Sequence, residues 1–211
     1  MQATSPLKGT LSIVATPIGN LGDFSARAAA TLSAADIIAC EDTRVTRRLL
    51  RLTSTTTKAK LISYHDYNGA KVRPQIIEHL REGKMVVLVS DAGTPLISDP
   101  GYKLVAECRN IGIRVISIPG PTAAISALTV SGLPSERFLF AGFVPSGKSA
   151  RQNAIKDFAD LKVTTIWFET PTRLNKTLRE MSAIMGDRRA TVARELTKFH
   201  EEAFHGTILE L

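Results

Sequence analysis

The stretch MVVLVSDAGTPLISDPG, residues 85–101, joins a continuously apolar run to a long loop rich in glycine, proline and acids. The run Met85–Val89 predicts a central strand of a parallel sheet, because such strands are buried on both faces. The segment Ser90–Gly101 is longer than a turn requires, and long ordered loops commonly bind a ligand. Pro100 is expected to begin the next helix, with Asp99 as its cap. The stretch therefore predicts an α/β domain whose site lies at the carboxyl ends of its strands.

On both sides of this strand, short β-rich runs alternate with helical stretches, which predicts a mainly parallel sheet covered on both faces. The expected strands are Thr10–Thr16, Ile37–Cys40, Lys60–Ser63, Met85–Ser90 and Arg114–Ile118. The expected helices are Ser25–Ala35, Thr43–Leu52, Lys71–Glu82, Tyr102–Ile111 and Thr122–Ser131.

A Gly-Leu-Pro-Ser break predicts a boundary near Ser131–Glu136, between a domain over 1–131 (leader 1–8) and a domain over 136–211. The second domain is expected to contain strands Phe138–Phe143, Val163–Phe168 and Ala190–Arg194 and helices Ser149–Leu161 and Thr172–Met185. Residues 206–211 are interpreted as the opening of a helix, so we expect the natural chain to continue. The predicted fold class is α/β: two α/β domains, with a mainly parallel N-terminal sheet and a mixed C-terminal sheet.

The composition is that of an ordinary globular protein, with 44% hydrophobic and 22% charged residues. No apolar run approaches the roughly 18 residues of a membrane helix, and the N-terminus does not resemble a signal peptide. Cys40 and Cys108 are interpreted as buried thiols of a reducing compartment, which predicts a cytoplasmic protein. The four histidines lack ligand spacing, so no metal is expected. A net charge of +7 favours polyanionic partners.

Two further loops follow predicted strands. Thr16–Asp23 contains two glycines that permit close backbone approach, but it lacks the G-x-G-x-x-G pattern of dinucleotide-binding folds. Ile118–Ala127 has small residues after Gly120, which leave a helix N-terminus open to a ligand. The alternative interpretations are a tight turn with a helix cap for the first loop and a plain helix–sheet contact for the second.

In this order and spacing the three loops resemble those of the tetrapyrrole (corrin/porphyrin) methylase superfamily. Gly93–Ile97 takes the place of its Gly-Asp-Pro-x-Val methyl-donor loop, and Pro119–Ala124 is similar to its Pro-Gly-x-Thr-Ser-Ala element. Ala15–Asn20, Glu41–Arg44 and Phe168–Arg173 are similar to signatures of one branch, the ribosomal RNA small subunit methyltransferase I group. The resemblance covers almost the whole chain.

The resemblance implies a homodimer that binds S-adenosylmethionine in the cleft between its two domains. It also implies 2′-O-methylation of a cytidine ribose in 16S rRNA, as free rRNA or in the small ribosomal subunit. Members continue past a stretch like Gly206–Leu211, which supports the expected continuation. The expected donor contacts are Pro17, Gly93, Thr94, Pro95, Ile97, Thr122, Ala123, Ala124 and Phe168. One departure is Thr94, which stands where small-molecule methylases carry an acid that Asp91 or Asp99 would have to supply.

Two regions are candidates for RNA contact. One helix face, which we call the arginine face, carries cations at i, i+3, i+4 and i+7: Arg44, Arg47, Arg48 and Arg51. Mutual repulsion among them favours a role facing phosphate, with a solvated face as the alternative. His65 and Tyr67 lie in a polar loop after the third strand, where rings stack on unpaired bases or simply pack.

The segment GFVPSGKS, residues 142–149, satisfies the P-loop pattern residue for residue. However, Pro145 has no N–H to offer in a loop whose amides should cradle phosphate. Nucleotide hydrolysis is therefore the weaker interpretation. Lys148 and Arg151 are interpreted as contacts to RNA phosphate or as solvated cations.

Methyl transfer to a ribose needs in-line alignment and a base near the hydroxyl group. The sequence offers five candidates without ranking them: Asp91, Glu169, Glu195, Lys198 and His200. Two alternatives remain at this point. One is methylation of a tetrapyrrole precursor or a protein residue on the same scaffold, and the other is a non-catalytic RNA-binding protein.

Overall fold

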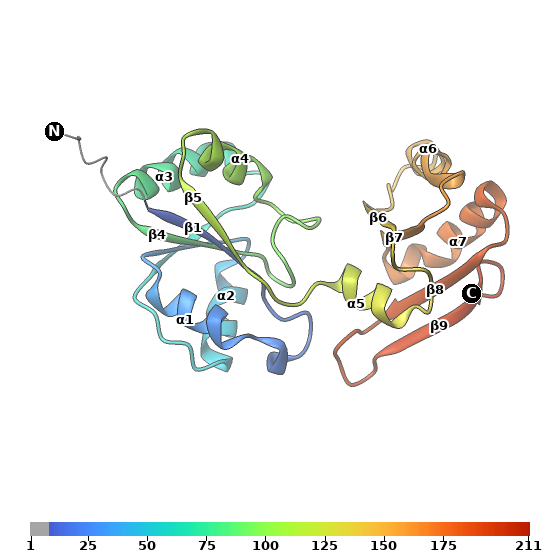
Figure 1. Cartoon of the computed structure of the whole chain (residues 1–211), viewed down its shortest axis with the longest axis horizontal. Helices are drawn as coiled ribbons and strands as arrows, with labels where there is room; N and C mark the ends of the chain where they lie inside the picture. The colour runs from blue at the N-terminus through green and yellow to red at the C-terminus, as the bar shows by residue number, and fades with distance from the viewer. Residues whose placement is uncertain (1–8) are drawn as a thin grey trace. The chain divides into compact units, whose positions relative to one another are not determined.

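The computed structural model describes residues 9–211, so the predicted leader over 1–8 lies outside the described residues. The chain divides into two compact units, of which unit 1 ends at Thr122 and unit 2 begins at Ala123 (Figure 1). Helix α5 (Ala123–Val130) thus belongs to unit 2. The domain boundary near Ser131–Glu136 stays a prediction. Within the described residues, no helix is long and apolar enough to cross a membrane.

Unit 1 is built on a five-stranded sheet in the order β3-β2-β4-β1-β5, in which every strand pair is parallel. Its strands are β1 (Thr10–Val14), β2 (Ile37–Cys40), β3 (Lys60–Ser63), β4 (Met85–Val89) and β5 (Arg114–Ile118). Its helices are α1 (Ala26–Ala34), α2 (Thr43–Leu52), α3 (Gly69–Arg81) and α4 (Tyr102–Asn110), with a short 3₁₀ turn η1 (Leu21–Asp23). The predicted parallel α/β sheet is confirmed, and β4 occupies its middle.

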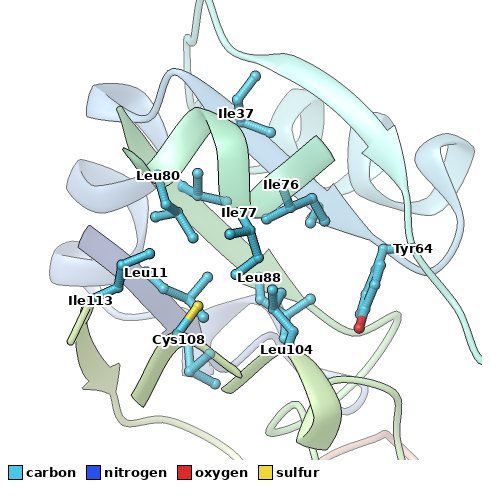
Figure 2. Packing of buried hydrophobic residues seen from close by; sticks show 13 residues of the cluster. Leu11, Ile37, Tyr64, Ile76, Ile77, Leu80, Leu88, Leu104, Cys108 and Ile113 are labelled. Atoms are coloured by element: carbon cyan, nitrogen blue, oxygen red, sulfur yellow. The ribbon is translucent and has the colours of Figure 1, made fainter. Parts of the chain in front are cut away.

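The two faces of this sheet carry separate apolar clusters, because successive side chains of a strand point to opposite sides. On one face, Leu11 and Leu88 pack with buried residues of α3 and α4 such as Leu80 and Leu104 (Figure 2). The other face packs against residues of α1 and α2, for example Leu32. Neighbouring strands β4 and β1 therefore lead into helices on opposite faces. In open α/β sheets, ligands bind at the carboxyl ends of strands where the chain turns to opposite faces in this way.

The helices of unit 1 begin where local side chains satisfy backbone amides. Ser25 accepts a hydrogen bond from the amide of Ala28 at 3.0 Å to cap α1, and Asp42 caps α2. The predicted cap of α4 is wrong: the helix begins at Tyr102 after Gly101, which has φ +137° and provides no side-chain cap. Asp99 is instead hydrogen-bonded to Ser90.

Unit 2 contains α5, β6 (Phe138–Phe143), α6 (Lys148–Ala159), β7 (Thr164–Phe168), α7 (Pro171–Met185), β8 (Arg189–Arg194) and β9 (Glu202–Thr207). Strands β6 and β7 form a parallel pair, and β8 and β9 form an antiparallel pair. Both strand directions expected of a mixed sheet are present, divided between two pairs. Residues 206–211 do not open a helix, because Gly206 and Thr207 complete β9 opposite Ala190 and Arg189 and a turn follows.

Candidate functional site

The three loops singled out in the sequence meet at the carboxyl end of the unit 1 sheet, which we call the loop edge. Thr16 and Gly93 exchange two backbone hydrogen bonds, of 2.8 and 3.0 Å. The Thr94 hydroxyl donates to the Pro121 carbonyl at 3.0 Å, and the Thr16 hydroxyl donates to the Ser90 carbonyl at 3.2 Å. These hydrogen bonds thus fasten the loops after β1, β4 and β5 to one another.

Backbone geometry explains why the close approach of these loops to one another needs glycine. A Cβ on Gly120 would lie 3.0 Å from the Cβ of Ala15, and Gly93 adopts φ +84°. In the same loop, Leu96 and Ser98 also adopt left-handed conformations, with φ of +74° and +62°. Such residues cost about 1–3 kcal/mol each and cluster at ligand sites. The loop after β4 therefore carries strain that a plain connection would not need.

Three carboxyl groups gather at this edge, and we call them the acidic corner: Glu41, Asp91 and Asp99. The Asp91 carboxylate accepts the Asp42 amide hydrogen at 3.1 Å. Partial burial and the charge of Asp42 raise the pKa of Asp91, and burial together with Asp91 raises the pKa of Asp99. Burial, Asp91 and Asp99 raise the pKa of Glu41 in the same way. A cationic ligand at this corner would relieve the mutual repulsion.

The residues expected to contact the methyl donor are divided between the units. Gly93 and Pro95 are buried in unit 1, while Ile97 is exposed. In unit 2, Ala124 belongs to the small apolar core and Phe168 packs against it. Pro17, Thr94 and Thr122 are half-buried in unit 1, and Ala123 is half-buried at the start of unit 2. A donor cleft between the two domains stays a prediction.

The arginine face is exposed on α2, as its spacing predicts. Its first member is already engaged: Arg44 contacts Asp42 at 2.6 Å, and this pairing lowers the pKa of Asp42 to about 2. Arg47 donates to the Thr43 hydroxyl at 3.3 Å. Within residues 9–211, Arg48 and Arg51 have no such partner, so these two are best placed to reach a phosphate.

The loop after β3 holds its two rings differently. Tyr67 is fully exposed, whereas His65 is half-buried, with the ring centroids 6.1 Å apart in an edge-to-face arrangement. The Asn68 side chain fixes the loop by donating to the Ser63 carbonyl at 3.0 Å and accepting the His65 amide hydrogen at 2.9 Å. The Nδ1 atom of His65 is buried and meets no hydrogen-bond partner in the described part of the chain.

Glu169 is engaged in a scaffold contact. Its carboxylate accepts hydrogen bonds of 2.7 Å each from the Thr170 amide, the Arg173 Nε and the Thr177 hydroxyl. Although burial opposes the change, these bonds lower the pKa of Glu169. Arg173 also donates to the Val144 carbonyl at 2.7 Å, so the signature Phe168–Arg173 fastens the start of α7 to the end of β6.

The P-loop-like segment has the wrong polarity for phosphate. Arg151 is buried, and its guanidinium donates to the Ser146 carbonyl at 2.8 Å and the Pro145 carbonyl at 3.4 Å. Two further bonds of 2.8 Å join it to Glu180 on α7. The loop thus turns carbonyl oxygens inward, where a phosphate-binding loop presents amide hydrogens. The interpretation of Arg151 as an RNA contact or a solvated cation is wrong, while Lys148 is exposed at the start of α6.

The last three catalytic candidates lie together on the tip of the β8–β9 hairpin. Glu195 and Lys198 form an ion pair of 2.9 Å, and His200 is exposed beside the ring of Phe199. The sequence reasoning missed Phe199, which is 97% exposed. No signal marked it, because exposure of a single ring depends on the hairpin, and β9 was not predicted. Among the described residues, no group of three or more His, Cys, Asp or Glu could hold a metal ion.

Comparison with solved structures shows the same fold in proteins of low sequence identity. Cobalt precorrin-4 methyltransferase superposes with a TM-score of 0.69 at 19% identity, covering 95% of this chain and 86% of that one. Diphthine synthase gives 0.71 at 16% identity, covering 96% and 83%. Uroporphyrin-III C-methyltransferase from Thermus thermophilus, complexed with S-adenyl homocysteine, gives 0.63 at 18% identity, covering 96% and 89%.

Curated relatives are far more similar in sequence. Proteins named ribosomal RNA small subunit methyltransferase I are 49% identical in Mesorhizobium japonicum and 50% identical in Halalkalibacterium halodurans. These matches cover 98% and 96% of this chain and 70% of each relative. The Thermotoga maritima protein of that name is 46% identical, and the match covers 96% of this chain and 90% of that protein. The profile of the family described as tetrapyrrole (corrin/porphyrin) methylases matches residues 10–211, and the chain therefore belongs to this family.

Proposed function

We propose that this chain transfers a methyl group from S-adenosylmethionine to the 2′-oxygen of a cytidine ribose in 16S rRNA of the small ribosomal subunit. The observation that carries the proposal is the fastened loop edge, in a chain 46–50% identical to proteins named ribosomal RNA small subunit methyltransferase I. The net charge of +7 and the exposed arginine face suit a polyanionic substrate. The proposal includes a cytoplasmic location and a homodimer.

The residues at the loop edge fit such a donor. When bound, S-adenosylmethionine supplies an electrophilic methyl group on a positively charged sulfonium. The acidic corner would provide the compensating negative charge, because burial and mutual repulsion raise the pKa of its carboxyl groups and a nearby cation would favour their charged form. The glycines at 93 and 120 let the loops approach one another closely, because a Cβ at either position would meet atoms of a neighbouring loop or strand end. The donor residues Pro17, Thr94, Pro95 and Ile97 would line the donor site from unit 1, and Thr122, Ala123, Ala124 and Phe168 would complete it.

Two tasks fall to the chain in the reaction. It must hold the ribose oxygen, methyl carbon and sulfur in line, which contributes about 7–11 kcal/mol in well-aligned systems. It must also take the hydroxyl proton as the oxygen–carbon bond forms and the carbon–sulfur bond breaks. Asp91 suits the second task best, because it is exposed and its raised pKa makes it a better proton acceptor near neutrality. Glu169 suits it least, since three donors already occupy its carboxylate.

RNA would be held by side chains of both units. Arg48 and Arg51 would contact phosphates, and Tyr67 would stack on an unpaired base with His65 beside it. Arg44 would act mainly through Asp42, whose backbone amide donates to Asp91. The start of the arginine face is therefore coupled to the acidic corner. Lys148 of unit 2 would add one further phosphate contact.

The test is transfer of a tritiated methyl group from S-adenosylmethionine to unmodified small ribosomal subunits, with free 16S rRNA alongside. We expect label in RNA that resists alkali at a single ribose. Arg48→Ala should weaken RNA binding and reduce the salt slope of the affinity by about 1, with donor affinity kept. Lys103→Ala, an exposed cation of α4, is the charge-matched control. No incorporation, with donor binding intact, would contradict RNA as the acceptor and favour a small molecule or a protein residue.

A further inference from the structure

The hairpin of β8 and β9 ends in a turn, residues 195–201, which we call the hairpin tip. At its apex Phe199 is 97% exposed, nearly the full surface of its ring. His200 follows and is also exposed, with its ring centroid 5.0 Å from that of Phe199 and the planes 86° apart. The two rings therefore form a right-angled corner that projects into solvent.

The backbone of the hairpin tip is held by its own hydrogen bonds. The Lys198 amide donates to the Glu195 carbonyl at 2.9 Å, and the Glu201 amide donates to the Lys198 carbonyl at 3.2 Å. Glu195 and Thr197 adopt left-handed conformations, with φ of +52° and +68°. Residues other than glycine keep such conformations only where the surroundings enforce them. The backbone of the apex is thus a defined turn from which both rings project.

The acids of the hairpin are used inside it. Glu195 pairs with Lys198 at 2.9 Å, Glu201 accepts the amide hydrogen of Thr197, and Glu202 pairs with Arg194. Each carboxylate that would repel a polyanion therefore has a donor within the hairpin. Among residues 9–211, the rings of Phe199 and His200 have no such ionic partner and are free to contact a ligand.

We propose that the hairpin tip binds an unpaired base of the RNA substrate, with Phe199 stacked on the base and the His200 ring at its edge. This inference rests on the proposed function and adds a contact from unit 2 to it. Unpaired bases offer a flat π-face and a polar edge, and proteins hold them by stacking on aromatic rings with hydrogen bonds at the edge. The apolar ring of Phe199 matches the π-face of such a base, and the polar ring of His200 matches its edge.

A protein partner fits this surface less well. Stable protein interfaces bury about 800 Å² on each side, with an apolar centre. The neighbours of Phe199 in the turn are Lys198, His200 and Glu201, which are polar and exposed. One ring within a polar rim is too small to anchor such an interface, yet it is large enough to cover one base.

The test compares Phe199→Leu, which keeps apolar bulk without a π-face, with Phe199→Trp, which enlarges the π-face. The probe is a 12-nucleotide single-stranded RNA with one 2-aminopurine, whose fluorescence is quenched when the base stacks on an aromatic ring. The second readout is methyl transfer to unmodified small subunits, recorded as KM and kcat. Phe204→Leu, in the paired part of the same hairpin, is the matched control. Phe199 is exposed, so the melting temperature of its variants should not change.

We expect Phe199→Leu to weaken RNA binding about 5- to 100-fold and to abolish the quenching, with KM raised and kcat kept. Phe199→Trp and Phe204→Leu should bind like the wild type. Equal binding and quenching by Phe199→Leu and the wild type would overturn the inference, as would loss in Phe199→Ala that leucine restores. If the wild type transfers no methyl group to RNA, the proposed function fails. In that case, quenching that depends on Phe199 would still support the stacking contact. If that quenching were absent as well, both the proposed function and the stacking contact would be overturned.

Discussion

Unit 1 packs its sheet between two clusters of fully buried aliphatic side chains, whereas unit 2 has one small cluster around Ala124, Leu128 and Ile166. Where unit 2 lacks apolar contacts, charged side chains join its elements. Arg151 connects α6 to Glu180 of α7, and the Glu169 network fastens α7 to β6. A close-packed aliphatic cluster penalises the cavity left by a truncated side chain, whereas a buried ion pair penalises the loss of either partner. The two units should therefore lose stability through different kinds of substitution.

The largest difference is expected for truncation of an aliphatic side chain. Leu80→Ala in unit 1 removes a side chain with no exposed surface and should lower the free energy of unfolding by about 2–5 kcal/mol. Leu128→Ala in unit 2 should cost less, because its surroundings are partly open and can collapse. Urea unfolding, followed by Trp167 fluorescence and by far-ultraviolet circular dichroism, measures both. Equal costs would break the comparison between the units.

The next effect concerns the polar links of unit 2. Glu169→Ala leaves Arg173 and Thr177 without their acceptor and should lower the free energy of unfolding by about 1.5–3 kcal/mol. Glu136→Ala, at an exposed position of the same unit, should stay within about 0.5 kcal/mol of the wild type. A collapse of kcat in Glu169→Gln with an unchanged melting temperature would instead make Glu169 the general base.

The smallest effect should come from the acidic corner, where partly buried carboxyl groups repel one another. The raised pKa of Asp99 means that the folded protein keeps its proton to a higher pH than the unfolded chain does. Stability therefore falls as the pH rises from the usual Asp pKa through the raised one, and the loss is complete above that window. Asp99→Asn should raise the melting temperature by roughly 1–3 °C at about pH 8 and by less at about pH 4.

Thermal melts at the two pH values measure this difference. Asp157→Asn, on the exposed side of α6, is the control. An equal gain at both pH values would show that the charge of Asp99 is not the cause.

Much of unit 1 follows from the sequence, because its strands are apolar runs that end at glycine, proline or a polar cap. Met85–Val89 is such a run, and the structure ends β4 one residue before the predicted end. The spacing of the arginine face also predicts its exposure. The partners of these arginines cannot be predicted from the spacing. Arg44, for example, pairs with Asp42, the residue that caps its own helix, rather than with a helical neighbour.

Unit 2 was harder to predict for physical reasons. Strand β9 has the sequence EAFHGT, which lacks alternating apolar residues and is specified by pairing with β8. Arg151 lies just after a pattern typical of phosphate binding, and its partner Glu180 comes from another helix. The scaffold role of Glu169 depends on contacts that converge from β6 and α7. All three features depend on contacts between different elements of the fold, so none can be predicted from the local sequence.

The position of β1 has a consequence for synthesis of the chain. Thr10 pairs with Met85 on one side and with Arg114 on the other, so both neighbours of β1 are made long after it. At about 5–20 residues per second, β1 waits on the order of ten seconds before β5 can close the sheet, first with two open edges and, once β4 is made, with one. Until then its apolar residues can pair with other strands or other chains. We therefore expect slow, aggregation-sensitive folding that begins with α2, β3 and α3 and ends when β1 is enclosed.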